Sequence, residues 1–494
     1  MRPLRSVAAL LACLAVLAVA ACGGDDGASG LGSALSYVPA DTPFAVAIDT
    51  DLDGDQYKKL DAILSKFPGA DTIKGLLEGQ LVMGQEGVSF KEDIRPLLGN
   101  PAVISATDVS SFLSDSEEAG FVASLQVKDT DALDSLIEKT APKDLGEVAG
   151  ATVYQDEDTF FAVEGDVIVF GGSRELLEAA LKRADGDEGL SEDDFEASLD
   201  GLPGEALARV YVDVQGLLGQ SEGTEAARKI AWVDALRTLG LTVSAQDNSV
   251  DIDFSLRTEG ELTDEDLPLA AGDEPAEVIQ RPNEIGVGLR DPSQLVTFFE
   301  SALQAVDPKS FGDYETGKRA LAQRLDLDVE RDLVAQLTGN LSFSASIDGQ
   351  FGARAEVKDP DAFAKTLDKV VKGLPELGVA ESVRRAGDLY ELRTADGAGF
   401  VFGMAGGAFV VGTDAARAAA VAAAQPEPVE GASGSVVVRA DAEGIARQLL
   451  EQIGPAFGIP DGVAPLLARP LNELRGSVAS STDGMTGKFS LTLD

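Results

Sequence analysis

One pattern of eight residues occurs twice in this chain and constrains its fold more than any other feature. The two copies are Gln126–Leu133 and Glu356–Phe363, in which an alternating strand ends in Val-Lys-Asp and an amphipathic helix follows at once. Asp129 and Asp359 stand where a side-chain oxygen can accept hydrogen bonds from the first free amides of the helix. We therefore predict a strand followed by a capped helix at both places.

Other short motifs return at nearly the same distance along the chain. Gly99-Asn100 returns as Gly339-Asn340, and Gly172-Ser173 returns as Gly412-Thr413. Offsets that agree over half of a chain indicate a duplicated unit. Because hairpins alternate with helices, we predict an α+β fold of two tandem homologous modules, each a mainly antiparallel sheet with packed helices. The pattern is equally compatible with separate sheets and with one continuous sheet.

The same reading divides the chain into segments. We predict a lipoprotein signal peptide at 1–21, a flexible tether at 22–36, a first α+β module at 37–258, an acidic linker at 259–278 and a second α+β module at 279–494. Within the first module, a helical stretch through Thr224–Leu239 is expected to bury Trp232, and a hairpin turned by Asp247-Asn248 follows it.

The first 22 residues carry the pattern of an exported lipoprotein. Arg2 and Arg5 precede an apolar run from Val7 to Val19, and small residues lead directly into Cys22. Such a run is typical of a secretory signal and is too short to serve well as a spanning helix. We expect Cys22 to carry a lipid that holds the protein on the extracytoplasmic side of the cell membrane. The alternative is a soluble secreted protein.

Composition excludes several kinds of chemistry. The chain has no histidine, and its two cysteines are Cys13, inside the leader, and Cys22. Zinc sites of the His/Cys type and catalytic triads that use histidine are therefore excluded. The net charge of −44 opposes contact with nucleic acid phosphates, so no nucleic acid partner is expected. No cofactor is expected either, apart from the metal considered next.

One acidic loop begins like a calcium-binding loop. Asp49, Asp51, Asp53 and Asp55 alternate along it, which is the spacing at which such loops place oxygen ligands. Leu60 stands where a bidentate glutamate is usual. Two interpretations follow, a calcium site and a strand-to-helix turn whose aspartates cap the next helix.

Four further stretches resemble one family. In chain order they are Pro39–Pro43, Phe90–Ile94, Gly120–Ala123 and Val167–Ser173. Together they resemble the bacterial lipoproteins grouped as domain of unknown function 3352. The resemblance implies a shared fold and a location in the envelope, and it brings no assigned activity.

These features predict a non-catalytic protein that binds or scaffolds other components of the bacterial cell envelope. Its expected partners are the membrane, through the lipid on Cys22, and an unknown protein or apolar ligand. One alternative is a carrier that holds an apolar ligand or lipid between its helices and its sheet. A carboxylate-dependent hydrolase of envelope polymers is the less favoured alternative, because the sequence marks out no pair of acids.

Overall fold

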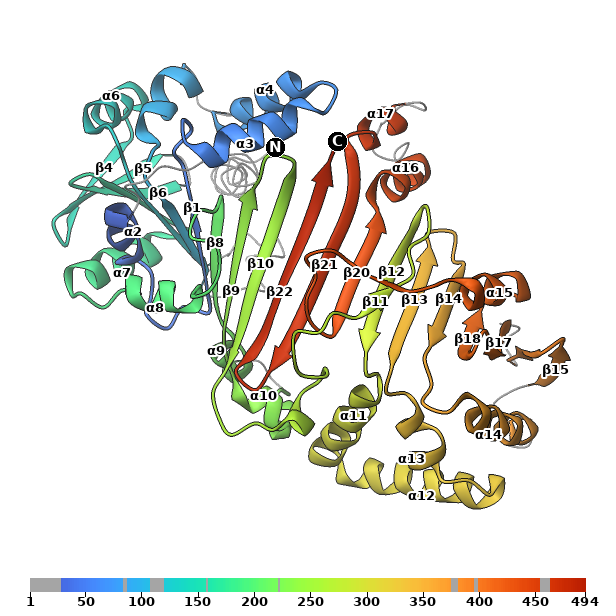
Figure 1. Cartoon of the computed structure of the whole chain (residues 1–494). Helices are drawn as coiled ribbons and strands as arrows, with labels where there is room; N and C mark the ends of the chain where they lie inside the picture. Colours follow the sequence, from blue (N-terminus) through green and yellow to red (C-terminus); the bar gives the residue numbers. More distant parts are fainter. Residues whose placement is uncertain are drawn as a thin grey trace. The chain divides into compact units, whose positions relative to one another are not determined.

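The computed structural model describes residues 28–82, 87–106, 120–156, 159–220, 223–374, 381–394, 399–453 and 463–494. Its helices and antiparallel strands confirm the predicted α+β class (Figure 1). The chain divides into two compact units. The first unit comprises the described residues of Met1–Ser221 together with Arg237–Arg257, and the second comprises those of Glu222–Leu236 and Thr258–Leu493.

The sheet of the first unit is centred on β1 (Phe44–Ile48). β1 pairs with β2 (Ala102–Ala106) on one side and with β8 (Ala208–Asp213) on the other. From β2 the antiparallel pairing continues in the order β3, β7, β6, β5 and β4, and from β8 it continues to β9. The β9 strand (Leu236–Ala245) pairs with β10 (Ser249–Thr258) in the expected hairpin. The other strands are β3 (Phe121–Gln126), β4 (Lys143–Val148), β5 (Ala151–Asp156), β6 (Thr159–Glu164) and β7 (Val167–Gly171).

Helices connect these strands. At the end of β3, the Asp129 carboxylate accepts a 3.0 Å hydrogen bond from the Ala132 amide, which confirms the predicted cap of α6. The helices and helical turns of this unit are α2 (Ala28–Leu35), α3 (Asp55–Ser65), α4 (Ala70–Leu81), η1 (Phe90–Ile94), η2 (Arg95–Leu97), α6 (Thr130–Thr140), α7 (Arg174–Asp185), α8 (Glu192–Ser198) and α9 (Val214–Gln220).

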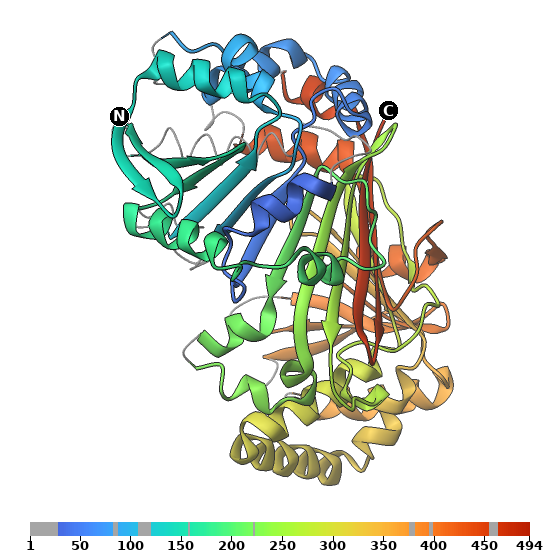
Figure 2. The same cartoon turned by 90° about the vertical axis from the view of Figure 1, so that its left-hand side faces the viewer.

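The first described helix, α2, overturns part of the predicted tether. The tether prediction for 22–36 is wrong over Ala28–Leu35, because Leu31 and Leu35 are buried where α2 lies along β2 and β3 (Figure 2). The Ser124 hydroxyl donates a 2.7 Å hydrogen bond to the Ala34 carbonyl. Glycine and serine residues hid this helix, although its apolar residues have the i, i+3, i+4 spacing of one buried face.

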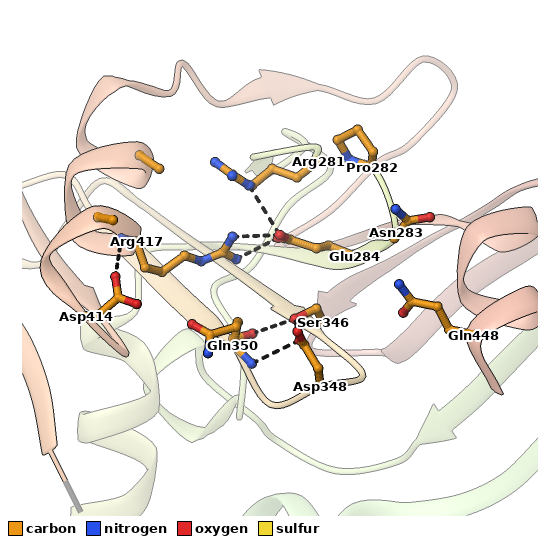
Figure 3. Close-up of a pocket in the computed structure, with 12 residues that line it drawn as sticks. Arg281, Pro282, Asn283, Glu284, Ser346, Asp348, Gln350, Asp414, Arg417 and Gln448 are labelled. Carbon is orange, nitrogen blue, oxygen red and sulfur yellow. Dashed lines mark hydrogen bonds and ion pairs between the residues drawn. The ribbon is translucent and has the colours of Figure 1, made fainter. Parts of the chain in front are cut away.

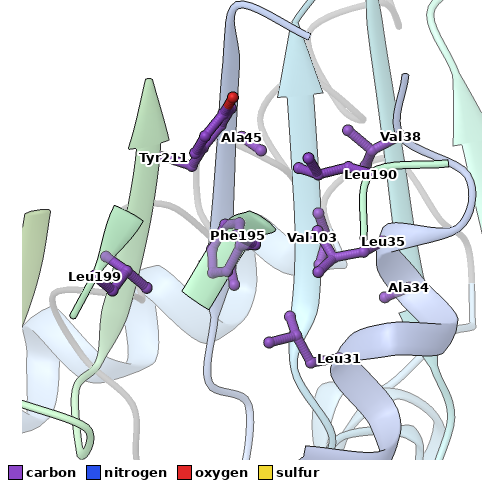
Figure 4. Close-up of a cluster of buried hydrophobic side chains, with 11 residues drawn as sticks. Leu31, Ala34, Leu35, Val38, Ala45, Val103, Leu190, Phe195, Leu199 and Tyr211 are labelled. Carbon is purple, nitrogen blue, oxygen red and sulfur yellow. The ribbon is translucent and has the colours of Figure 1, made fainter. Parts of the chain in front are cut away.

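The short helix α8, which the sequence analysis did not predict, completes the same core. Its Phe195 is fully buried and lies among apolar side chains of α2, β1, β2 and β8 (Figure 4). The Phe195 and Tyr211 rings are 6.3 Å apart, centre to centre. The α2 and α8 helices therefore cover one face of this sheet together.

The second unit repeats the same order of strand pairing around β12 (Glu284–Arg290). β12 pairs with β13 (Asn340–Ser346) and with β20 (Val436–Asp441). From β13 the pairing continues in the order β14, β18, β17, β16 and β15, and from β20 it continues to β21 and β22. The further strands are β14 (Phe351–Ala355), β15 (Ser382–Ala386), β16 (Leu389–Arg393), β17 (Gly399–Ala405), β18 (Ala408–Gly412), β21 (Leu471–Ser481) and β22 (Gly484–Leu493).

The helices of the second unit include the second predicted cap. The Asp359 carboxylate accepts from the Ala362 amide at 3.0 Å and begins α14, as expected. The helices and helical turns are η3 (Ala227–Lys229), α10 (Ala231–Ala235), η4 (Asp264–Asp266), α11 (Ser293–Val306), α12 (Pro308–Leu325), α13 (Val329–Asp332), η5 (Val334–Gln336), α14 (Pro360–Gly373), α15 (Ala415–Ala423), α16 (Ala442–Ile453) and α17 (Ala464–Ala468). Among the described residues, no helix combines the length and apolarity that a membrane crossing requires.

The helical stretch predicted through Thr224–Leu239 is helical only in η3 and α10, and it is wrong from Leu236 onward. Trp232 is buried as expected, but α10 ends at Ala235 and Leu236 begins β9. In β9, Leu239 and Leu241 lie opposite Val212 and Val210 of β8. These leucines have a spacing that is also compatible with a helix, but they lie in a strand because pairing with β8 outweighs the local helical preference.

The acidic segment 259–278 packs on the second unit. Leu267 and Ala276 are fully buried, and the Arg290 side chain donates a 2.6 Å hydrogen bond to the Ala271 carbonyl. At the end of the segment, β11 (Glu277–Val278) pairs with β19 (Glu427–Pro428). The segment predicted as a linker is therefore held by backbone pairing and by burial.

Candidate functional site

The central strands of the second unit bury a polar face. The register places Gly286 opposite Ser344 and Gly288 opposite Ser342, and both serines are fully buried. A Cβ atom on Gly288 would lie 2.3 Å from the Glu277 carbonyl oxygen, so glycine is required for β11 to pass this close. The Ser342 hydroxyl donates a 2.8 Å hydrogen bond to that same carbonyl. Glycine and serine therefore let the β11 backbone pack directly on the sheet.

A buried ion pair lies at the edge of this polar face. Arg417 on α15 reaches Glu284 at the start of β12 with two hydrogen bonds, from Nη1 to Oε1 and from Nη2 to Oε2, both 2.6 Å long (Figure 3). The side chains of the two residues are only 7% and 10% exposed. The Arg417 guanidinium also donates to the Ser344 hydroxyl at 2.8 Å. The pair therefore joins α15 to two adjacent strands.

The positive charge of Arg417 determines the protonation state of Glu284. Burial acts to raise the pKa of Glu284, but the hydrogen bonds and positive charge of Arg417 outweigh it and hold that pKa below its usual range. Glu284 is therefore an ionised carboxylate and cannot act as a general acid near neutral pH.

An open pocket of about 390 Å³ lies over the ion pair. The Arg281 guanidinium, whose Nε lies 3.3 Å from Glu284 Oε1, forms part of its wall. Figure 3 shows the polar side chains that face it from the start of β12, from the β13–β14 turn and from α16. The lining residues are Arg281, Pro282, Asn283, Glu284, Ser346, Asp348, Gln350, Asp414, Ala416, Arg417, Ala420 and Gln448. The pocket offers guanidinium, amide and carboxylate groups to a small polar molecule.

A second carboxylate in the pocket is also held ionised. The Ser346 hydroxyl donates to Asp348, and this hydrogen bond keeps the pKa of Asp348 below its usual range. A hydrolase with two carboxylates needs one of them protonated as the acid. Glu284 and Asp348 do not meet that requirement.

The opposite face of the same strands is apolar and open. The register aligns Val287 with Phe343 of β13 and with Val438 of β20. Ile285 is 41% exposed and Phe343 is 38% exposed. The Phe343 and Phe351 rings stack with their centres 6.2 Å apart. The strands thus expose their apolar side chains while they bury serines.

The predicted calcium loop forms a series of turns between β1 and α3. The Asp51 amide donates to the Asp49 carboxylate at 3.0 Å, and the Asp53 amide donates to Asp51 at 3.2 Å. Asp53 pairs with Arg95 at 2.8 Å, and Asp55 pairs with Lys58 at 3.2 Å.

The loop is a strand-to-helix turn, as one of the two interpretations predicted, but its aspartates do not cap the helix that follows. The helix begins after Gly54 without a side-chain cap. In the part of the chain that the structure describes, no three acidic, histidine or cysteine side chains are grouped to hold a metal ion. Calcium binding by Asp49, Asp51, Asp53 and Asp55 stays a prediction.

Asp49 yields a prediction about pH. Burial raises the pKa of Asp49 to about 6, so the folded protein holds a proton there that the unfolded chain releases nearer pH 4. Stability from this group is therefore present below about pH 4 and is lost as the pH rises through about 6. Asp49→Asn is expected to raise the free energy of unfolding by about 1–2 kcal/mol at about pH 7.5 and by much less at about pH 4.

Urea unfolding of the two proteins at both pH values measures this difference. The matched control is Asp53→Asn, because Asp53 is solvent-exposed and its ion pair with Arg95 lies at the surface. An Asp49→Asn protein that gains nothing at the higher pH, or gains equally at both, would contradict the explanation.

The polar face and the ion pair were missed by the sequence analysis. Two signals could have indicated them. Gly286 and Gly288 alternate within an otherwise apolar strand, which is typical of a close backbone approach. Arg417 is the one charged residue in the alanine-rich Ala415–Ala423.

Cys22 lies outside the described residues, so its lipidation stays a prediction.

Comparisons with known proteins identify a family of unknown function. A family model described as "Protein of unknown function (DUF3352)" matches residues 4–381. No curated protein matches the chain. Three solved structures of TP0453 are similar to this chain. Crystal forms III and IV are each 13% identical to it, and form I is 15% identical. The aligned parts cover 47%, 45% and 47% of this chain in forms III, IV and I, and 81%, 80% and 80% of the TP0453 chains. Their TM-score is 0.26 in each case, and at that value the likeness supports no conclusion about function.

Proposed function

The chain belongs to the DUF3352 family of proteins of unknown function, and on this premise we propose that it is an exported, lipid-anchored, non-catalytic binding protein of the bacterial cell envelope. The single observation that carries the binding function is the open apolar face of β12, β13, β14 and β20. The basic and apolar leader that ends at Cys22 supports export and the anchor.

An apolar sheet face normally packs against another layer of the fold. Here the polar face is the one covered, by β11 and α15, while Ile285 and Phe343 each keep more than a third of their surface accessible. Exposed apolar surface of this kind marks a place where a partner or an apolar ligand binds. The face therefore provides the binding surface that the proposal needs.

The polar pocket supports the non-catalytic part of the proposal. Glu284 is neutralised by Arg417, and Asp348 accepts from Ser346, so neither carboxylate is available as a proton donor near neutral pH. The chain has no histidine to take that role. Neither of these two carboxylates therefore supplies the protonated group that carboxylate-dependent hydrolysis requires.

A second candidate is a carrier of an apolar ligand or lipid. The stacked Phe343 and Phe351 rings, beside Ile285 and Val287, form an aromatic and aliphatic surface that fits an acyl chain as well as it fits a protein. The identity of the bound molecule distinguishes the carrier from the scaffold.

Photo-crosslinking from the apolar face tests both candidates in one experiment. Phe343→p-benzoylphenylalanine places a photoreactive ring of similar shape on that face, in the full chain expressed in its own envelope. We expect irradiation to crosslink another molecule at this position. That molecule should be a protein if the chain is a scaffold and a lipid if the chain is a lipid carrier. Mass spectrometry of the adducts identifies which.

The matched control places the same group at Asp388, an exposed position in the turn between β16 and its neighbour β15. Equal labelling from Asp388 and Phe343, or no adduct from Phe343, would refute binding at this face. The anchor is checked separately, since Cys22→Ser should abolish metabolic labelling with palmitate.

A further inference from the structure

Helix α11 leaves two large apolar side chains of one stripe exposed. Leu295, Phe299, Ala302 and Val306 follow the i, i+4, i+7, i+11 spacing of one helix stripe. Leu295 is 41% exposed and Phe299 is 53% exposed, although both lie in that stripe. Every residue of α11 and of its neighbour α12 is described, and none of them is buried. In a globular unit such a stripe is normally the buried part of the helix.

The hairpin of α11 and α12 differs in charge from the rest of the chain. Its four acidic residues are balanced by four basic ones, whereas the whole chain has a net charge of −44. Two of the acids, Glu300 and Glu315, lie 2.7 Å and 3.4 Å from Lys318. Lys309, Arg319 and Arg324 are exposed on α12. The hairpin itself therefore has no net charge, although the acidic turn η4 contacts α11.

Aromatic rings adjoin the apolar stripe. The centres of the Phe299 and Tyr314 rings are 6.1 Å apart, and those of Phe311 and Tyr314 are 6.3 Å apart. The Lys318 ammonium lies 5.6 Å from the centre of the Tyr314 ring. Phenylalanine and leucine on one side with lysine and arginine nearby is the composition of helices that lie in a membrane interface.

We propose that the α11–α12 hairpin binds the headgroup–acyl boundary of a lipid bilayer. The stripe with Leu295 and Phe299 enters the boundary, and the long basic side chains of α12 reach the headgroups. In Figure 1 the two helices lie together at one end of β12, β13 and β14. This contact goes beyond the proposed anchor, because it needs no lipid on Cys22.

Flotation with lipid vesicles tests the contact without the anchor. The mature protein, residues 22–494 with Cys22→Ser, is mixed with vesicles of phosphatidylcholine containing a minor fraction of phosphatidylglycerol. We expect a measurable part of the protein to float with the vesicles. The double variant Leu295→Asp with Phe299→Asp should reduce the partition coefficient at least about tenfold, because two apolar side chains no longer leave water. Both positions are exposed, so the variant should keep its far-UV circular dichroism spectrum.

The matched control is Leu449→Asp with Leu466→Asp, which changes two exposed leucines on α16 and α17. It should float as the parent protein does. Absence of flotation, equal flotation of the hairpin variant, or an equal loss in the control would each overturn the proposal. A different result would assign the stripe to a second copy of the chain instead. In that case the parent protein would not float but would sediment as a dimer, and the hairpin variant would sediment as a monomer. Failure here leaves the crosslinking result at Phe343 unaffected, so the two proposals fail independently.

Discussion

Arg417→Met is expected to lower the free energy of unfolding of the second unit by about 3–5 kcal/mol. The substitution keeps most of the side-chain volume but leaves the Glu284 carboxylate, which is 10% exposed, without its bidentate partner and with only the more exposed Arg281 beside it. A buried charge that has lost its main partner costs more than the lost hydrogen bonds alone. The single tryptophan, Trp232, lies in the second unit, so its fluorescence during urea unfolding reports on the unit that is changed.

Two variants show whether the ion pair explains this loss. Adding Glu284→Gln to Arg417→Met removes the buried charge that has lost its main partner and should recover a large part of the stability. Arg281→Met removes a more exposed arginine beside the same carboxylate and should cost less than about 1 kcal/mol. A double variant as unstable as Arg417→Met would contradict the charge explanation and indicate a packing defect.

The cost of Arg417→Met should also depend on pH. The folded-state pKa of Glu284 lies below its unfolded value, so the stabilisation is present above the unfolded pKa of about 4.3 and is lost as the pH falls through the folded one. The difference in stability between parent and variant should therefore shrink below about pH 4.

Phe195→Ala should lower the stability of the first unit by about 3–5 kcal/mol. Phe195 of α8 is fully buried among side chains of α2 and the sheet, and alanine would leave a cavity that these elements cannot close completely (Figure 4). Because Leu31 and Leu35 share this cluster, α2 should loosen as well. Hydrogen exchange followed by mass spectrometry should show faster exchange in peptides from α2, β1 and β2.

Phe299→Ala is the matched control for the same chemical change. Its ring is 53% exposed, so we expect a loss below about 1 kcal/mol. If Phe195→Ala left exchange in α2 unchanged, the helix would not be held by this cluster, and the tether interpretation of 28–35 would regain support.

Local patterns were sufficient wherever the physical cause is local. Asp129 and Asp359 cap α6 and α14 because a carboxylate beside free helix amides can accept from them whatever the distant surroundings are. Local spacing failed beyond Ala235, where it favours a longer helix and the pairing of Thr238–Val243 with β8 decides for a strand.

The sequence by itself determined the α+β class, the repeated strand-to-helix units and the absence of histidine chemistry, because these depend on composition and on neighbours within a few residues. Only the tertiary structure decided that the Glu284 side chain meets that of Arg417, 133 residues away, and that α2 is packed instead of free. It also decided which face of β12 is covered. Alternation places apolar and polar residues on opposite faces of a strand, but the path of β11 and α15 determines which face is buried.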